Sequence, residues 1–354
     1  MLFETLHKFL TDCTTKKKIP GCVCWIGNNK KTLFFQEYGY AQIVPEKIKM
    51  NRATIFDLAS ITKPVATAIA IMQLIEKKKI KLNDKIKKNL PDFKNKLNGE
   101  KTIHELLIHT SGIPAWYPTY ILSEKQRMEY LANTNTGKSK VIYSCLGYII
   151  LGKIVEAVSG RNFDKYCSTY IFKKIGVNNT RFGYIKTKNI AATEFGNRHE
   201  KSMALKYGKV SKINWRDYVI KGEVHDGNSF YSYKGVSGNA GLFSNAGDLA
   251  KIMQYYLDGE IVRPSILKMM IKDHTGGKEK RGLGWVIDPY PGLLSGTTFY
   301  HTGFTGTMCL ADPKSNLIII LLTNAVHPKV RLGIMPKIRR KVVKLTSKIL
   351  KSGK

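Results

Sequence analysis

The sequence predicts a mixed α/β (α+β) protein in which β-rich segments at the two ends enclose a mainly helical middle. Residues 21–40 and 282–322 are rich in β-branched and aromatic residues and are broken by turns, whereas residues 60–172 contain runs with helical periodicity. The chain has 354 residues, of which 43% are hydrophobic. This content can bury a sizeable core in one large domain or in two intertwined ones.

The N-terminal residues predict an amphipathic helix followed by a β-hairpin. Leu6 and Leu10 recur at helical spacing. Residues 21–27 and 31–40 then flank a short polar loop at 28–30, the pattern of two strands joined by a hairpin turn.

The middle of the chain predicts two buried helices and an irregular segment. Residues 65–75 are apolar on nearly every face, and Pro64 fits the first helical turn, where an N–H group has no partner to lose. Residues 143–160 form a second apolar helix that Gly160 closes. Periodicity fades from about 178 to 235, and such a long irregular stretch is commonly a lid or a substrate wall.

Between these helices, residues 102–109 predict a short helix opened by a Thr102 cap. His104 and His109 on this helix are candidate bases. Because a histidine on a short amphipathic helix more often packs or faces solvent, we favour a structural role for both.

The C-terminal part predicts several strands and a last helix. Strands are expected at 282–287, 298–301, 306–311 and 317–322, separated by turns. A final helix over 334–349 carries its apolar residues on one face and its basic residues elsewhere. Because this helix directly follows the strands, packing on a sheet is favoured over resting on a membrane.

The charge of the chain is strongly positive. Lys and Arg number 58 against 26 Asp and Glu, which gives a net charge of +32 and would ordinarily suggest nucleic acid or an anionic lipid surface as a partner. The basic residues are spread in short runs, without a zinc-finger spacing or an aromatic RNA-binding signature. We expect no specific nucleic-acid partner, and basic-surface binding remains the weakest of three hypotheses.

The six cysteines form neither a disulfide framework nor a metal-ligand spacing. The N-terminus lacks the apolar stretch and cleavage site of a secretory signal, and no apolar run is long enough to span a bilayer. We therefore expect a cytoplasmic protein with free thiols, no transmembrane segment, no metal and no cofactor. The cysteines are Cys13, Cys22, Cys24, Cys145, Cys167 and Cys309.

Ser60 and Lys63 are the first candidate catalytic residues. They stand three residues apart at the opening of the predicted buried helix, a spacing that puts side chains on one face, roughly 5–6 Å apart at Cβ. A serine hydroxyl attacks a carbonyl only if a base removes its proton, and a lysine can do so once burial and neighbouring charge lower its pKa. The same pattern arises by chance, and serine is a common helix cap, so other signals must support it.

Two further signals follow in the chain: Tyr-Ser-Cys at 143–145 before a helix, and His-Thr-Gly at 301–303 at the end of a strand. With Ser60 and Lys63, they resemble the serine β-lactamase and penicillin-binding protein superfamily. The resemblance is strongest to the branch of class C β-lactamases, D-alanyl-D-alanine carboxypeptidases and related esterases. It runs from about residue 20 to 330. It includes residues 102–114, 147–160, 224–226, 238–244 and 303–313.

The resemblance implies a β-lactamase/transpeptidase-like fold. The N-terminal hairpin and the C-terminal strands would form one antiparallel sheet flanked by the terminal helices, with a mainly helical region inserted and the active site at the junction. Residues 1–354 would form a single catalytic unit. Its sheet region would be 1–58 plus 262–354, and its helical region 59–261 with the irregular 178–235 segment.

The resemblance also implies residue roles. Ser60 would form the acyl-enzyme, while Lys63 and Tyr143 would handle its proton during attack and later activate the hydrolytic water. The backbone N–H groups of Ser60 and Phe304 would form the oxyanion hole, in which loss of one donor costs roughly 10²–10³ in rate. His301 and Thr302 would face the carboxylate or leaving-group side of the substrate. The expected substrate-binding and oxyanion residues are Cys145, His301, Thr302, Gly303 and Phe304.

Two positions depart from the family pattern. Its usual Y-x-N ends in an Asn whose amide orients the lysine and bonds the acyl amide of the substrate; here Cys145, a weak donor and acceptor, takes that place. Where many β-lactamases have Lys-Thr-Gly, this chain has His301, as in some carboxypeptidases and esterases. Both departures argue against an efficient β-lactamase.

The first functional hypothesis is a cofactor-independent serine hydrolase. It would cleave an ester or a D-amino-acid-type peptide or amide through an acyl-Ser60 intermediate, with a small molecule or a peptidoglycan fragment as substrate. The second hypothesis is a low-turnover penicillin-binding or sensing protein that keeps the same pocket.

Overall fold

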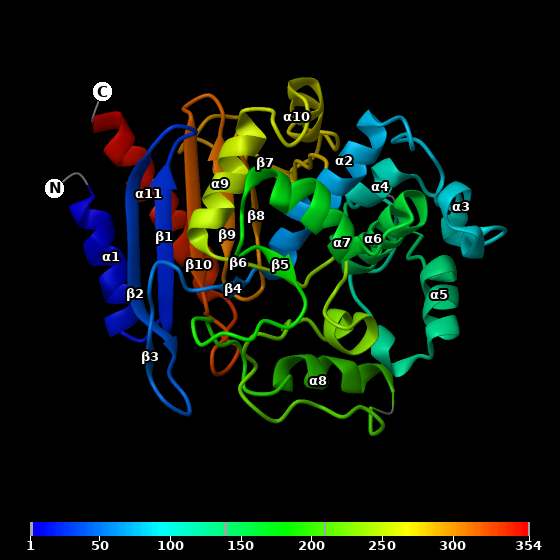
Figure 1. Ribbon diagram of the computed structural model, residues 1–354, viewed down its shortest axis with the longest axis horizontal. Coiled ribbons are helices and arrows are strands. Elements are labelled where there is room, and N and C mark those ends of the chain that lie inside the picture. The colour runs from blue at the N-terminus through cyan, green and yellow to red at the C-terminus, as the bar shows by residue number, and fades with distance from the viewer. Residues whose placement is uncertain (1–2, 138–139, 209, 353–354) are drawn as a thin grey trace.

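The computed structural model describes residues 3–137, 140–208 and 210–352, and its centre is a seven-stranded antiparallel sheet (Figure 1). The strand order is β3-β2-β1-β10-β9-β8-β7. Strand β1 pairs with β10, with Cys24 opposite Leu321, so the two β-rich ends form one sheet and the expected fold class is confirmed. The strands are β1 (Gly21–Gly27), β2 (Thr32–Gln42), β3 (Ile48–Lys49), β7 (Val286–Ile287), β8 (Phe299–Thr302), β9 (Met308–Asp312) and β10 (Leu317–Thr323).

Helices cover both faces of this sheet (Figure 1). Along β10, Ile319 and Leu321 pack with the two terminal helices, whereas Ile318 and Ile320 pack in the core that includes α9. Because alternate residues of a strand point to opposite faces, a strand buried on both faces reads as one apolar run. The predicted packing of the C-terminal helix on the sheet is confirmed. These helices are α1 (Glu4–Thr15), α9 (Ala246–Leu257) and α11 (Ile334–Ser352).

Ser60 lies at the start of a continuous helical segment. The 3₁₀ turn Ala59–Ile61 leads into a π-helical stretch, Lys63–Ala68, with Pro64 in its first turn, and then into α2 (Ile69–Glu76). This agrees with the expected buried helix, although its first turns are not α-helical.

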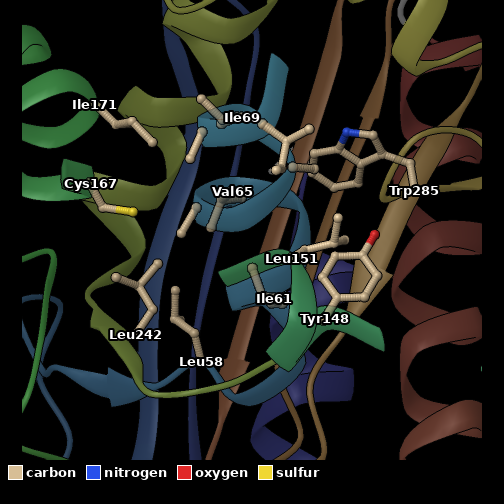
Figure 2. Close-up of a cluster of buried hydrophobic side chains, with 14 of the residues drawn as sticks. Leu58, Ile61, Val65, Ile69, Tyr148, Leu151, Cys167, Ile171, Leu242 and Trp285 are labelled. Carbon is tan, nitrogen blue, oxygen red and sulfur yellow. The ribbon is translucent and has the colours of Figure 1, made fainter. Parts of the chain in front are cut away.

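The helical segment after Ser60 is fixed by apolar packing. Figure 2 shows Ile61 and Val65 among Tyr148 and Leu151 of helix α6 (Cys145–Ser159) and Trp285, and all five side chains are buried. Each buried aliphatic side chain of this size stabilises the fold by roughly 1.5–3 kcal/mol. The nucleophile candidate therefore stands on a rigid element.

The other helices end where the sequence indicates. The Thr102 side chain accepts the Glu105 N–H in a capping box, and Gly160 follows α6 with a φ of 66°, a conformation that favours glycine. The remaining helices are α3 (Ile86–Asn89), α4 (Ile103–Leu107), α5 (Glu124–Asn133), α7 (Phe163–Cys167), α8 (Arg198–Ala204) and α10 (Pro264–Met270).

A second, three-stranded sheet and helix α8 were not anticipated from the sequence. The sheet order is β4-β6-β5, and β4 leads directly into the Ser60 turn. Most of residues 178–235 is irregular, as expected, apart from α8, β5 and short helical turns. The strands are β4 (Phe56–Asp57), β5 (Arg181–Phe182) and β6 (Leu242–Ser244).

No helix within the described ranges is long and apolar enough to cross a bilayer. All six cysteines are free thiols.

Candidate active site

A cavity of about 900 Å³ opens beside the end of β8 and the start of α6. Seven of the eight predicted site residues line it, and Lys63 lies buried directly beneath Ser60. The structure thus brings together side chains from three distant parts of the chain. The seven are Ser60, Tyr143, Cys145, His301, Thr302, Gly303 and Phe304.

The turn that carries Ser60 is held in an uncommon backbone conformation. Ala59 has a φ of 47°, a left-handed value that costs of order 1–3 kcal/mol for a non-glycine residue. Asp57 Oδ1 accepts the Ala59 N–H at 2.8 Å, and the Thr62 hydroxyl donates to the Ala59 carbonyl at 2.7 Å. The other Asp57 oxygen accepts the His225 N–H at 2.7 Å, which ties the turn to the opposite wall.

Lys63 has an acceptor for each of its three protons. Its Nζ donates to Ser60 Oγ at 2.9 Å, to the Asn239 carbonyl at 3.0 Å and to Cys145 Sγ at 3.4 Å. Because an ammonium group has three donors and no acceptor, this set holds the amine in one position against the serine hydroxyl.

The protonation states of the Lys63 group follow from burial and mutual charge. Burial lowers the pKa of Lys63, but the charges that Cys145 and Tyr143 carry when ionised outweigh it, so its pKa lies above the ordinary value. Burial raises the pKa of both Tyr143 and Cys145, so these two groups are neutral near pH 7 and do not then supply the charges that raise the pKa of Lys63, whereas burial, which lowers it, remains. The form that can accept the Ser60 proton is therefore the deprotonated one, which becomes more populated as pH rises.

His109 positions the segment that carries Tyr143. Its Nδ1 accepts the Ser144 N–H at 3.0 Å, and its ring packs on Tyr143 with centroids 4.7 Å apart. The Ser144 hydroxyl donates to the Pro114 carbonyl at 2.7 Å and accepts the Gly147 N–H, which caps α6. His109 thus has the structural role that the sequence favoured, while His104 contacts His274 away from the cavity.

Two backbone N–H groups at the cavity floor are free to receive an oxyanion. Among the described residues, neither Ser60 N nor Phe304 N has a hydrogen-bond acceptor. The loop after β8 is tied to the Ser60 turn, because the Thr307 hydroxyl donates to the Leu58 carbonyl at 3.1 Å. Gly303 passes so close to that carbonyl that a Cβ would clash with it.

His301 presents an acceptor atom. Its Nδ1 lies 2.8 Å from the Thr302 carbonyl, which can only accept, so Nδ1 carries the proton and Nε2 does not. Burial and the charges of Lys63 and Arg281 hold the pKa of His301 well below its usual value, so the imidazole is neutral. His301 Nε2 has no partner among the described residues. A neutral acceptor cannot donate to a substrate carboxylate.

Arg281 is a cavity residue that sequence reasoning missed. It is 6% exposed, its guanidinium carbon lies 5.6 Å from the Tyr143 ring centroid, and its Nε has no partner among the described residues. One of its nitrogens pairs with Glu279, and its charge acts on His301. Nothing in the sequence separates Arg281 from the other basic residues, because its segment matches no motif.

The described residues contain no group of three or more His, Cys, Asp or Glu side chains arranged to hold a metal ion. The chemistry that the cavity offers is nucleophilic: a serine with a lysine at its hydroxyl and two N–H donors beside it.

Comparison with known proteins agrees with this geometry. The family model named Beta-lactamase matches residues 6–344, and the chain belongs to this family. The "Putative D-alanyl-D-alanine carboxypeptidase" of Escherichia coli K12 is 34% identical over 333 residues, which cover 83% of this chain and 74% of that protein. The "N-acetylmuramyl-L-alanine amidase" of Bacillus subtilis 168 is 32% identical over 356 residues, with 88% and 78% covered. A solved class C β-lactamase has the same fold, with a TM-score of 0.75, 17% identity, and 99% and 98% covered.

Proposed function

We propose that the protein is a serine acyl hydrolase that forms an acyl-Ser60 intermediate on a D-amino-acid-type peptide or amide, or on an ester. The observation that carries this proposal is the 2.9 Å hydrogen bond from the buried Lys63 amine to the Ser60 hydroxyl in the cavity. The chain's membership of a serine hydrolase family supports it. We also propose a reducing cytoplasm as its location, a proposal that the free thiols support.

The proposed reaction moves one proton in each direction. The deprotonated member of the Lys63–Tyr143 pair takes the Ser60 proton as Oγ attacks the substrate carbonyl, and the N–H groups of Ser60 and Phe304 stabilise the oxyanion. The bond to the leaving group breaks as the pair passes that same proton to it through the Tyr143 hydroxyl, and the acyl group stays on Ser60. Water then attacks the acyl-enzyme by the same route and regenerates the serine.

The leaving group is proposed to carry a carboxylate. Arg281 brings a buried guanidinium, of which one nitrogen pairs with Glu279, to the wall formed by Tyr143 and His301, and a guanidinium group has further donors for a carboxylate. The neutral His301 Nε2 would accept a hydrogen bond from the amine or alcohol that leaves. A D-amino acid released from a peptidoglycan fragment meets both requirements, and the name of the Escherichia coli relative is consistent with it.

A second candidate is a penicillin-binding or sensing protein with low turnover. It is favoured by Cys145, whose thiol contacts Lys63 at 3.4 Å where the family pattern has an amide. A thiol cannot supply the two donors and the carbonyl acceptor of that amide, so an acyl amide would bind less well.

One experiment separates the two candidates. The protein is incubated with a fluorophosphonate and with a fluorescent penicillin, the labelled residue is located, and turnover of a p-nitrophenyl ester and of a D-alanyl-D-alanine peptide is followed. Label on Ser60 with turnover supports the hydrolase, and label without turnover supports the sensor. Absence of label in folded protein contradicts both candidates. Ser60→Ala should take no label, and Ser211→Ala, a change at an exposed serine, is the matched control that should still be labelled.

A further inference from the structure

One arginine of the last helix, α11, contacts the loop that carries the Phe304 N–H group. The Arg339 Nη2 atom donates to the Gly303 carbonyl at 2.9 Å and to the Thr307 carbonyl at 3.0 Å. Gly303 and Thr307 are the first and last residues of the loop between β8 and β9, and the Gly303 N–H donates to the Thr307 carbonyl at 2.9 Å. Arg339 therefore joins the two ends of this loop to α11.

The same loop is also attached to the turn that carries Ser60. The Thr305 hydroxyl donates to the Asp57 carbonyl at 2.8 Å, just before that turn. Gly303 lies so close to the Leu58 carbonyl that no side chain would fit between them. The loop is thus held by two structures, the Ser60 turn and the arginine of α11.

The position of Arg339 is set by the packing of α11. The preceding residue, Ile338, is 3% exposed, and Val342 and Val343 are fully buried in the core between this helix and the sheet. Arg339 itself is half-buried and lines the cavity. Its hydrogen bonds therefore start from an element that is fixed relative to the sheet.

The Gly303 carbonyl and the Phe304 N–H belong to one trans peptide unit. Because this unit is planar, its C=O and N–H point in opposite directions, so a contact that fixes the carbonyl also aims the N–H. The carbonyl accepts from Arg339 and from the Gly306 N–H, the latter at 3.1 Å, whereas the Phe304 N–H has no acceptor in the part of the chain that the structure describes. A charged donor on the carbonyl also polarises the amide, which makes its N–H a stronger donor.

We propose that Arg339 is a positioning residue for the oxyanion hole, which aims and strengthens the Phe304 N–H through the Gly303 carbonyl. The inference rests on the proposed acyl-Ser60 hydrolase. It requires Arg339 to matter wherever an oxyanion forms on the acylated serine, whatever the charge of the substrate. Direct binding of a substrate carboxylate by Arg339 would instead affect anionic substrates alone.

The test uses a neutral ester and a transition-state analogue. p-Nitrophenyl acetate gives kcat/KM, and phenylboronic acid, which forms a tetrahedral adduct with an active-site serine, gives an inhibition constant. Arg339→Gln should weaken both by similar factors of about 10- to 100-fold, less than the roughly 10²–10³-fold cost of losing an oxyanion donor outright. Rates are expressed per site that a fluorophosphonate labels at completion, so misfolded protein does not enter. Arg340→Gln, a change at an exposed neighbour on α11, is the matched control and should alter neither quantity.

Unchanged values in Arg339→Gln would overturn the inference. A loss confined to esters whose leaving group carries a carboxylate would overturn it too, because that pattern belongs to direct substrate binding. Arg339→Lys keeps a cationic donor and should lie between wild type and Arg339→Gln in both quantities. Arg339→Met decides if Arg339→Gln does not fold. Failure of the proposed function is distinct, because then the wild type neither hydrolyses the neutral ester nor carries an acyl group on Ser60.

Discussion

The floor of the cavity and its walls are built in different ways. The floor consists of Ser60 and Lys63, three residues apart on one buried helical segment and joined by a 2.9 Å hydrogen bond. The walls bring Glu200, Asp226 and Arg281 from loops and a short helix that are distant in the sequence. The comparison suggests that the floor determines the reaction and the walls determine which substrate reaches it.

The largest expected effect comes from the floor. Lys63→Ala should lower kcat for any acyl substrate by at least about 10³-fold, because it removes the base at the serine hydroxyl. The Ser60→Ala, Lys63→Ala double variant should be no slower than Ser60→Ala alone, since the two residues act as one unit. Steady-state kinetics on one ester and one peptide checks this, and a double variant far slower than either single variant would refute the shared unit.

A smaller and selective effect is expected at the His301 wall. Arg281→Gln should lower kcat/KM about 100-fold for substrates whose leaving group carries a carboxylate, because a buried charged contact is lost, and should change neutral esters little. Lys278→Gln, an exposed position in the same cavity, is the matched control. Equal losses for both substrate classes would show that Arg281 supports the fold rather than binding the leaving group.

Substitution of Cys145 by Asn should raise activity, whereas the two substitutions above lower it. Cys145→Asn should raise kcat/KM for substrates with an acyl amide by about one to two decades and should leave short esters nearly unchanged. The reason is that the asparagine side chain restores to the acyl amide a hydrogen-bond partner worth about 1–3 kcal/mol. Cys145→Ser separates loss of the thiol from gain of the amide. An equal change for esters and amides in Cys145→Asn would mean that position 145 does not contact the acyl amide.

What could be predicted from the sequence follows the same division. Ser60 and Lys63 could be predicted because helical spacing alone places them together. The two terminal β segments could be predicted because their alternation and turns are local signals. Glu200 and Arg281 could not be predicted as cavity residues, because their positions depend on contacts such as the hydrogen bond between Glu200 and Gly227. No spacing in the sequence encodes such contacts. Strands of two or three residues, as in the second sheet, are too short to show a period.

A further expected effect is on the pH dependence of stability, and its sign differs between Glu200 and His301. The folded pKa of Glu200 is raised to about 8, so the folded state holds a proton that the unfolded chain loses above about pH 4.5. Stability is therefore lost as pH rises from about 4.5 to about 8. Urea unfolding across this range should show wild type falling relative to Glu200→Gln.

His301 should show the reverse trend. Its folded pKa lies well below 6.5, so the unfolded chain takes up a proton first as pH falls, and stability is lost below about pH 6.5. His301→Gln should remove that loss in the same unfolding series. A gap between wild type and either variant that does not change with pH would contradict the assigned protonation states.

The central claim is that Ser60 carries the acyl group, and intact-mass measurement after rapid acid quench tests it most directly. Incubation with a penicillin or an activated D-alanyl ester should add the mass of one acyl group, and peptide mapping should place it on Ser60. Ser60→Ala should show no addition. Turnover without a trapped adduct in the wild type, or an adduct on another residue that persists in Ser60→Ala, would contradict the account.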